Sequence, residues 1–217
     1  MTGQKPAESG RSGVIDPQLL RKALWLSSAT LHESVGRLGA LPSAIKPIEP
    51  EMRVCGPAFP VRTPAGDNLW IHRALAVAEP GDVLVVSAGD GIEFGYWGEI
   101  MATSAATRGL AGIVINGGVR DTLALRTLGL PTFSACVNIR GTVKDRNGDG
   151  AIGEPVTIGD VEIARGDLVF GDADGVVVLT PDQARFAIPA SLVREEKEAA
   201  IISRIRDGAL TVDVYDL

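Results

Sequence analysis

Residues 97–121 read WGEIMATSAATRGLAGIVINGGVRD, and this stretch decides the fold. Residues 97–108 combine small and apolar side chains at helical spacing without an internal proline, which predicts a helix. Residues 112–116 form a short β-branched run that is typical of a buried strand. Gly117-Gly118 then predicts a tight turn at the end of that strand, and a new helix is expected to begin near Asp121.

Three ionisable side chains of this stretch are expected to meet at one edge of a sheet. In open α/β sheets, ligands gather outside the carboxyl ends of the strands, and Arg120 and Asp121 follow such an end. Glu99 opens the preceding helix, close to the end of a strand predicted at 83–87. An acid, a cation and a second acid are the groups needed to bind a small anion, hold a metal ion and move a proton. The simpler interpretation of Arg120-Asp121 is a surface pair that caps a helix.

The composition is that of a single globular domain. The chain has 217 residues, of which 45% are hydrophobic and 22% charged, so residues 1–217 can form one sizeable core. The net charge of −6 argues against a nucleic-acid partner. There is no apolar run of membrane-spanning length and no signal-peptide pattern, so we expect a cytoplasmic protein without a membrane partner. Residues 1–13 are rich in glycine, serine and charge and are expected to be flexible.

The few cysteines and histidines limit the chemistry. Cys55 and Cys136 are expected to be reduced thiols rather than a disulfide. With His32 and His72 as the only histidines, a multi-histidine metal site is excluded, and oxygen ligands favour Mg²⁺ or Mn²⁺. For His72 two interpretations stay open. It is a satisfied histidine of its helix, or it contacts substrate because the Asp67-Asn68 start of that helix faces the crevice.

The segments on either side predict an α/β fold whose second half is antiparallel. Strands at 83–87, 112–116 and 131–137 alternate with helices, which indicates parallel neighbours joined by right-handed crossovers. Gly159-Asp160 lies between two β-branched runs and predicts a two-residue hairpin. Thr180-Pro181 begins a long charged helix with a kink or restart at Pro189. Three further helices are expected, one from Asp16-Pro17, one over 27–38 with Thr30 and Glu33 as its capping box, and one over 67–78. An extended segment is expected at 54–61, and strands are expected at 167–170 and 175–179.

Residues 145–150, DRNGDG, resemble the start of a calcium-binding EF-hand loop. The twelfth position of such a loop should be Glu, but Val156 stands there, and the surroundings predict strand rather than helix. A turn rich in Asn, Asp and Gly explains the same residues, and we favour it.

The order Trp97-Gly98-Glu99 and then Gly117-Gly118-Val119-Arg120-Asp121 resembles a known family signature, an acidic residue followed after twenty positions by Arg-Asp. The family is that of the 4-hydroxy-4-methyl-2-oxoglutarate / 4-carboxy-4-hydroxy-2-oxoadipate aldolases, related to the regulator of ribonuclease activity A proteins (RraA-like). The resemblance implies a β/β/α swivelling-domain-like sandwich. It also implies a homotrimer or homohexamer with active sites between subunits, and a metal-dependent aldolase that releases pyruvate.

The resemblance assigns roles residue by residue. Asp121 would hold the metal ion together with waters, and Arg120 would bind the pyruvyl end with backbone amides from Gly98 to Ile100. A glutamate of the C-terminal helical arm, residues 181–207, would complete the site of a neighbouring subunit. Glu198 is the first candidate and Glu195 the second, with a solvated helix face as the alternative for both. Further residues expected to take part are Glu99, where many family members have Asp, and the substrate-binding residues Asn68 and His72.

The proposed chemistry also follows from the residue types. Cleavage of a carbon–carbon bond beside a 2-oxo acid leaves an enolate, which a Mg²⁺ ion at Asp121 would stabilise. Arg120 offers a planar fork for a carboxylate or keto oxygen, and Glu99 could accept the proton of the C4 hydroxyl. The motif contains no lysine, which disfavours a Schiff-base aldolase. The same chemistry would allow oxaloacetate decarboxylation as a side activity.

Two questions stay open from the sequence. The preferred substrate is 4-carboxy-4-hydroxy-2-oxoadipate, and its extra carboxylate could be bound by Arg62, Lys46 or His72, without ranking. The alternative functions are a non-enzymatic, ribonuclease-regulating binding protein and another lyase or hydrolase that acts on a 2-oxo acid.

Overall fold

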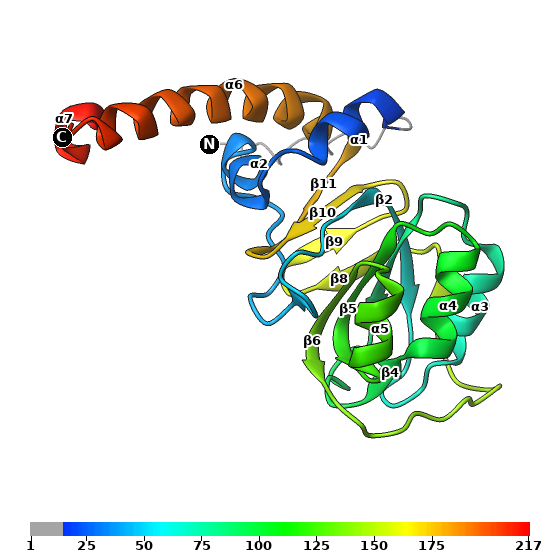
Figure 1. The fold of residues 1–217 in the computed structure, drawn as a ribbon. Coiled ribbons are helices and arrows are strands. Elements are labelled where there is room, and N and C mark those ends of the chain that lie inside the picture. The colour runs from blue at the N-terminus through cyan, green and yellow to red at the C-terminus, as the bar shows by residue number, and fades with distance from the viewer. Residues whose placement is uncertain (1–14) are drawn as a thin grey trace, which may run out of the picture.

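A computed structural model describes residues 15–217, and the flexibility predicted for residues 1–13 lies outside the described residues. Its centre is a nine-stranded mixed sheet with the order β1-β6-β5-β3-β2-β10-β11 (Figure 1). The remaining two of the nine strands lie off this order, with β4 paired to β5 and β7 paired to β2. Within residues 15–217 no helix is both long enough and apolar enough to cross a membrane.

The parallel core contains the three strands predicted as parallel neighbours, and the segment at 54–61, predicted only as extended, adds a fourth. It consists of β2 (Val54–Arg62), β3 (Val83–Ser87), β5 (Gly112–Val119) and β6 (Thr132–Val137), each parallel to its neighbour. All five residues of β3 are buried, as expected for a strand covered on both faces. The connections between these strands contain three helices, α3 (Leu69–Val77), α4 (Glu99–Thr107) and α5 (Thr122–Leu128).

The two faces of the sheet are covered by different layers, which confirms the β/β/α arrangement. The apolar residues of α3, α4 and α5 share one cluster with Leu84 and Ile113 of the sheet. The opposite face presents Val85 and Val114 to the hairpin of β8 (Val156–Ile158) and β9 (Val161–Ile163). This hairpin turns at Gly159-Asp160 as predicted.

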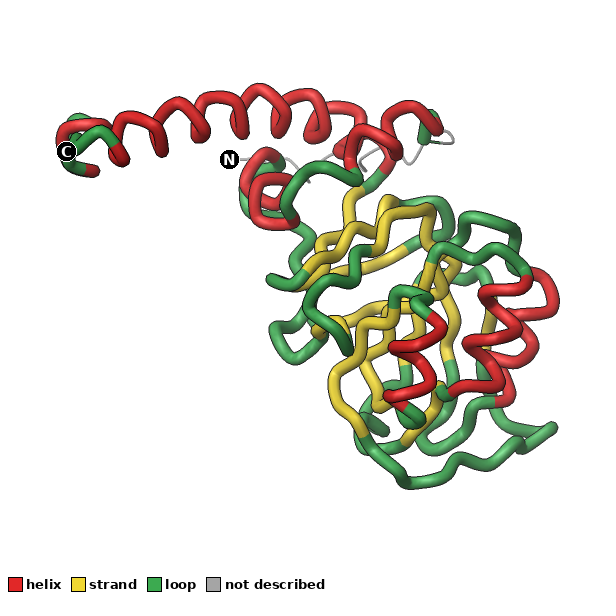
Figure 2. Tube along the Cα trace, viewed as in Figure 1, coloured by secondary structure: helices red, strands yellow, loops and turns green. Residues whose placement is uncertain are grey.

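The antiparallel edge carries the helices of both chain ends. β10 (Leu168–Asp172) pairs with β2 and with β11 (Gly175–Leu179), both antiparallel. The third apolar cluster packs α1 (Pro17–Ala23), α2 (Ser28–Ser34) and the first turns of α6 (Pro181–Arg206) on these strands. The tube view shows the rest of α6 projecting away from the sheet (Figure 2). The short elements β1 (Lys46–Pro47), β4 (Gly95–Trp97), β7 (Ala151–Ile152) and α7 (Thr211–Tyr215) were not predicted.

The predicted tight turn at Gly117-Gly118 is wrong, because β5 continues through both glycines to Val119. Because these two glycines have no side chains, β4 and the residues next to it can lie close to β5. A Cβ added at Gly117 would lie 2.9 Å from Cδ2 of Tyr96, and one at Gly118 would lie 2.6 Å from the carbonyl oxygen of Phe94. For the same reason the predicted helix at 97–108 begins only at Glu99, since Trp97 belongs to β4.

Two helix predictions also need correction. α6 runs through Pro189 without a restart, because Ala187, Ile188 and Ser191 are buried on either side of the proline and hold the helix against its neighbours. The second helix is capped by Ser27, whose side chain accepts from the amide of Thr30, and it ends at Ser34 rather than Leu38. The capping box of Thr180 and Gln183 at the start of α6 is present as predicted.

Candidate functional site

Arg120 and Asp121 lie where β5 ends and α5 begins, at the carboxyl edge of the parallel strands. Asp121 is the N-cap residue of α5 and adopts a left-handed backbone conformation with φ of 58°. Aspartate tolerates this conformation better than most residues, and such positions are frequent at functional sites. The backbone therefore turns the Asp121 carboxylate back toward the start of α4.

Glycines make room for these two side chains. A Cβ added at Gly98 would lie 2.4 Å from Oδ2 of Asp121 and 3.2 Å from Cγ of Arg120. A Cβ at Gly95 would lie 3.2 Å from Cβ of Arg120. The amide of Glu99 donates to Oδ2 of Asp121 at 3.1 Å, and the amide of Arg120 donates to the carbonyl oxygen of Trp97 at 2.8 Å. The start of α4 and the end of β5 thus hold the pair in place.

A small cavity of about 150 Å³ opens beside this pair. It lies where the start of α4, the start of α3 and the loop before β7 meet. Six of its eight lining residues are among those predicted for the site, namely Asn68, His72, Gly98, Ile100, Arg120 and Asp121. Met101 and Lys144 complete the lining, and neither was predicted.

Asn68 and His72 offer neutral polar groups to this cavity. Nδ2 of Asn68 donates to the carbonyl oxygen of Tyr96 at 3.0 Å. Its Oδ1 is buried and has no hydrogen-bond partner among the residues that the structure describes, so it can accept one from a ligand. Burial, and then the charge of Lys144, lowers the pKa of His72. This favours the neutral imidazole, which can both donate and accept a hydrogen bond.

The carboxylate of Asp121 suits a hard divalent cation. Its side chain is 44% exposed, and its Oδ2 lies 3.8 Å from Nε of Arg120. Within residues 15–217 no group of three or more His, Cys, Asp or Glu side chains could hold a metal ion together. Mg²⁺ commonly binds through one or two carboxylates and keeps several waters. Asp121 with waters therefore fits Mg²⁺, and Mn²⁺ takes the same oxygen ligands.

The predicted glutamates lie elsewhere. The side chain of Glu99 is exposed and does not line this cavity, although its amide holds Asp121. Glu198 accepts a hydrogen bond from Nε of Arg194 at 2.7 Å on α6, and Glu195 accepts one from the amide of Ser27 at 2.9 Å. Figure 1 shows α6 on the far side of the molecule from α4 and α5. Within one chain these two glutamates cannot complete the site.

The three predicted candidates for a second carboxylate are separated by the structure. Arg62 pairs with Asp149 at 3.0 Å, and Nζ of Lys46 donates to the carbonyl oxygen of Asp174. Neither lines the cavity, whereas His72 does. Lys144 is the cationic residue that sequence reasoning missed, because nothing in its local sequence connects it to the start of α3.

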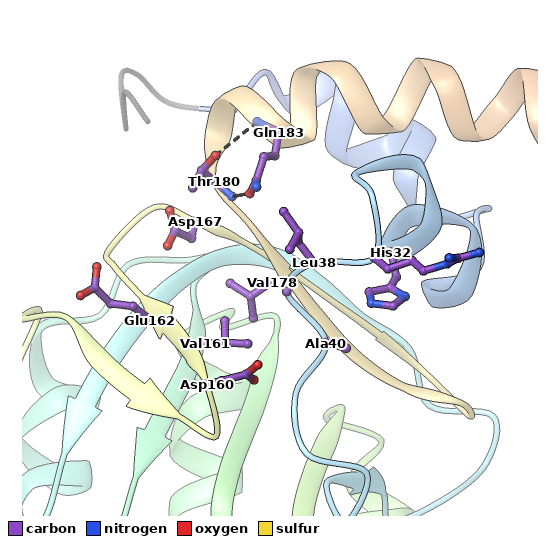
Figure 3. A pocket seen from close by; sticks show the side chains of 12 residues that line it. His32, Leu38, Ala40, Asp160, Val161, Glu162, Asp167, Val178, Thr180 and Gln183 are labelled. Carbon is purple, nitrogen blue, oxygen red and sulfur yellow. Dashed lines mark hydrogen bonds between the residues drawn. The ribbon is translucent and has the colours of Figure 1, made fainter. Parts of the chain in front are cut away.

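A second cavity, of about 330 Å³, lies between the β8–β9 hairpin, β11 and the start of α6 (Figure 3). Three of its polar side chains stabilise the fold. Thr180 and Gln183 form the capping box of α6, and Oδ2 of buried Asp167 accepts from the amide of Ala164 at 2.8 Å. The Arg120–Asp121 cavity is therefore the better candidate for chemistry.

The comparisons with known proteins agree with this choice of fold. A family model described as "RraA-like: Aldolase/RraA" matches residues 23–178. A protein of Halalkalibacterium halodurans named "Putative 4-hydroxy-4-methyl-2-oxoglutarate aldolase" is 32% identical over 190 residues, which cover 88% of this chain and 90% of that protein.

Two solved structures show the same architecture over most of their length. An uncharacterized protein from Pseudomonas syringae superposes with a TM-score of 0.83 at 26% identity, covering 94% of this chain and 95% of that one. RraAS2 of Streptomyces coelicolor, described as an unusual member of the RNase ES inhibitor RraA protein family, gives a TM-score of 0.73 at 29% identity. That alignment covers 88% of this chain and 99% of that one.

Proposed function

Because the chain belongs to the RraA-like (Aldolase/RraA) family, we propose that it is a divalent-metal-dependent aldolase that releases pyruvate. Its substrates would be 4-carboxy-4-hydroxy-2-oxoadipate, 4-hydroxy-4-methyl-2-oxoglutarate or both, cleaved to pyruvate plus oxaloacetate or a second pyruvate. The observation that supports this proposal best is the Arg120–Asp121 pair, packed over Gly98 at the mouth of a cavity that fits a small acid.

The residues of the cavity divide the work of binding. Arg120 presents a planar fork that can bind the carboxylate and keto oxygens of a 2-oxo acid. The first-turn amides of α4, such as that of Ile100, have no acceptor within the helix and can donate to the same carboxylate. Oδ1 of Asn68 can accept a hydrogen bond from the substrate hydroxyl. Together these groups fix the acid in one orientation.

Cleavage requires a proton acceptor and a stabilised product. A divalent cation held by Asp121 and waters would supply the positive charge that favours the enolate of pyruvate. The amide of Glu99 orients the Asp121 carboxylate. We assign the removal of the C4 hydroxyl proton to the Glu99 carboxylate, which lies outside the cavity wall and would act through a bridging water. The C3–C4 bond then breaks and its electrons pass to the keto oxygen of the pyruvate half. The proton taken from the C4 hydroxyl is then returned to C3 as the keto group re-forms. Oxaloacetate decarboxylation forms the same enolate.

A neighbouring copy of the chain would complete the site. An open hollow of about 620 Å³ adjoins Asp121 and is lined by Leu123, Val137 and Ile139, which are 77%, 61% and 91% exposed. Apolar side chains gathered at such a position are typical of an association surface. We propose that a homotrimer or homohexamer covers this surface and that Glu198 of a neighbouring subunit reaches the site.

Pyruvate release tests the proposal. The wild-type protein should release pyruvate from 4-carboxy-4-hydroxy-2-oxoadipate with Mg²⁺, lose this activity in EDTA and regain it when Mg²⁺ or Mn²⁺ is restored. Asp121→Ala should stay inactive at every metal concentration while keeping its fold. Release that survives exhaustive metal removal would contradict the metal-dependent mechanism.

A binding function is the second candidate, because the fold also matches a member of the RNase ES inhibitor family. A purified ribonuclease of that class provides the test. Inhibition by this protein, equally strong for the wild type and Asp121→Ala, together with no turnover of either acid, would favour the regulator over the aldolase.

A further inference from the structure

The cavity beside Asp121 holds two cations and one acidic side chain. Arg120 enters from the end of β5, and Lys144 enters from the loop that follows β6. Asp121 is the single carboxylate that lines the cavity, and Arg120 lies 3.8 Å from it. Lys144 is thus a second cation on a wall that holds one carboxylate. Such an arrangement favours a ligand with two negative groups.

The position of Lys144 is fixed by the backbone on both sides of it. The amide of Val143 donates to the carbonyl oxygen of Gly66 at 2.8 Å, and the amide of Asp145 donates to Oδ2 of Asp67 at 2.7 Å. Asp67 is 2% exposed, and its Oδ1 accepts from the amide of Leu69 at 2.6 Å. The buried carboxylate therefore fastens the loop of Lys144 to the start of α3, next to Asn68 and His72.

The EF-hand-like residues form the rest of this loop. Oδ1 of Asp145 accepts from the amide of Asn147 at 2.9 Å, which is the turn expected from its sequence. The carbonyl oxygen of Gly148 accepts from Nε1 of Trp70 on α3 at 3.0 Å. The loop is held to the start of α3 and to Trp70 on it, so the backbone at residue 144 has a defined position beside the cavity.

From this geometry we infer that Lys144 binds the distal carboxylate of the substrate and makes the site selective for 2-oxo acids with two carboxylates. The inference rests on the proposed function and assigns the residue that binds the second carboxylate of its substrates. Arg120 binds the 2-oxo acid end, and the Lys144 ammonium binds the carboxylate beyond C4 by a charge-assisted hydrogen bond. His72, whose pKa is lowered by burial and then by the charge of Lys144, also lines this cavity and offers a neutral hydrogen-bonding group.

Two acids of equal chain length test this inference without turnover. 2-Oxoglutarate carries a distal carboxylate, 2-oxopentanoate carries a methyl group there, and neither has a C4 hydroxyl to cleave. Calorimetric titration with Mg²⁺ present should show that the wild type binds 2-oxoglutarate about fivefold more tightly, as one charge-assisted contact at an exposed lysine allows. Lys144→Gln should lose this preference and keep its affinity for 2-oxopentanoate. Lys144→Arg should keep part of it.

Lys46→Gln is the matched control, because it removes the same charge from a lysine outside the cavity and should leave the preference intact. Equal weakening of both acids by Lys144→Gln, or a preference that survives it, would overturn the inference while leaving the aldolase untouched. If the wild type binds neither acid with Mg²⁺, this result would contradict the proposed function and, with it, the inference that rests on it.

Discussion

Gly98 contributes to the site by leaving the space that the Asp121 carboxylate occupies. Its φ of −158° suits any residue, so the backbone does not require glycine there. The requirement comes from Oδ2 of Asp121, which would lie 2.4 Å from an added Cβ. An alanine at residue 98 must push this flexible carboxylate aside, while the surrounding backbone stays in place.

Gly98→Ala should therefore separate activity from stability. We expect pyruvate release to fall about 10- to 100-fold, because a displacement of about 1 Å at a reacting group has this effect. The free energy of unfolding should fall by only about 1 kcal/mol, since glycine is preferred to alanine at a helix N-cap. Gly141→Ala, where an added Cβ meets nothing within 4 Å, is the control. Full activity in Gly98→Ala would contradict the packing argument.

His72 reports the position of Lys144 by its titration. Burial and the Lys144 charge both lower its pKa from the ordinary value of 6.5. Removing a neighbouring cation makes protonation easier, so Lys144→Gln should raise the pKa of His72. NMR titration of the imidazole signals measures this directly, and His32, which lines a different cavity, is the internal reference. An unchanged His72 titration in Lys144→Gln would show that the two side chains are not close.

For individual residues, the sequence predicted which side chains lie together when they are close in the chain. It did not predict contacts between residues that are far apart in the chain. Arg120 and Asp121 could be placed because a buried strand ends immediately before them. Lys144 could not, because its position depends on the carboxylate of Asp67, far away in the sequence. The Glu99 side chain shows the opposite case, since its spacing matched a signature but the side chain does not line the cavity.

Among the elements, the loop at 143–148 depends most on a single buried group. Asp67→Asn replaces one accepting oxygen with an amide that cannot accept from the backbone N–H of Asp145. We expect the free energy of unfolding to fall by about 1–3 kcal/mol, the cost of a buried unsatisfied group. Thermal unfolding measures this change, and the preference for 2-oxoglutarate should fall as well.

Asp149→Asn provides the comparison for this loop. It weakens an exposed ion pair with Arg62, which contributes at most about 1 kcal/mol, and leaves the Asp67 contacts unchanged. If Asp67→Asn is no less stable than Asp149→Asn, the buried carboxylate does not hold the loop.

The element boundaries show where local patterns reach their limit. Gly117-Gly118 predicted a turn because glycine favours turns, but here neighbouring strands leave no space for a side chain. Pro189 predicted a kink or restart, yet α6 continues through it with buried residues on both sides. In both cases tertiary packing overrides a preference that is correct for an isolated segment.

For the whole molecule, the length of α6 indicates a role outside its own chain. Its 26 residues span about 39 Å, and only the first turns contribute to the apolar cluster with α1 and α2. Glu198 lies beyond these turns. We therefore predict that each active site combines Asp121 of one subunit with Glu198 of another.

Mixing inactive variants tests this sharing. Asp121→Ala keeps Glu198, and Glu198→Ala keeps Asp121, so random hybrids should regain about one quarter of the wild-type sites. The measurement is pyruvate release after joint unfolding and refolding, with each variant treated alone as the control. No recovery in hybrids that assemble, or full activity of Glu198→Ala alone, would contradict the shared site.

The central claim is that the Arg120–Asp121 site forms the enolate of pyruvate with the help of a divalent cation. The most direct measurement is the exchange of the pyruvate methyl protons with D₂O, followed by NMR, because it needs no knowledge of the second product. We expect the wild type with Mg²⁺ to remove the methyl signal, and EDTA or Asp121→Asn to stop this exchange. Exchange that continues without metal, or in Asp121→Asn, would contradict metal-dependent enolate formation at the Arg120–Asp121 site.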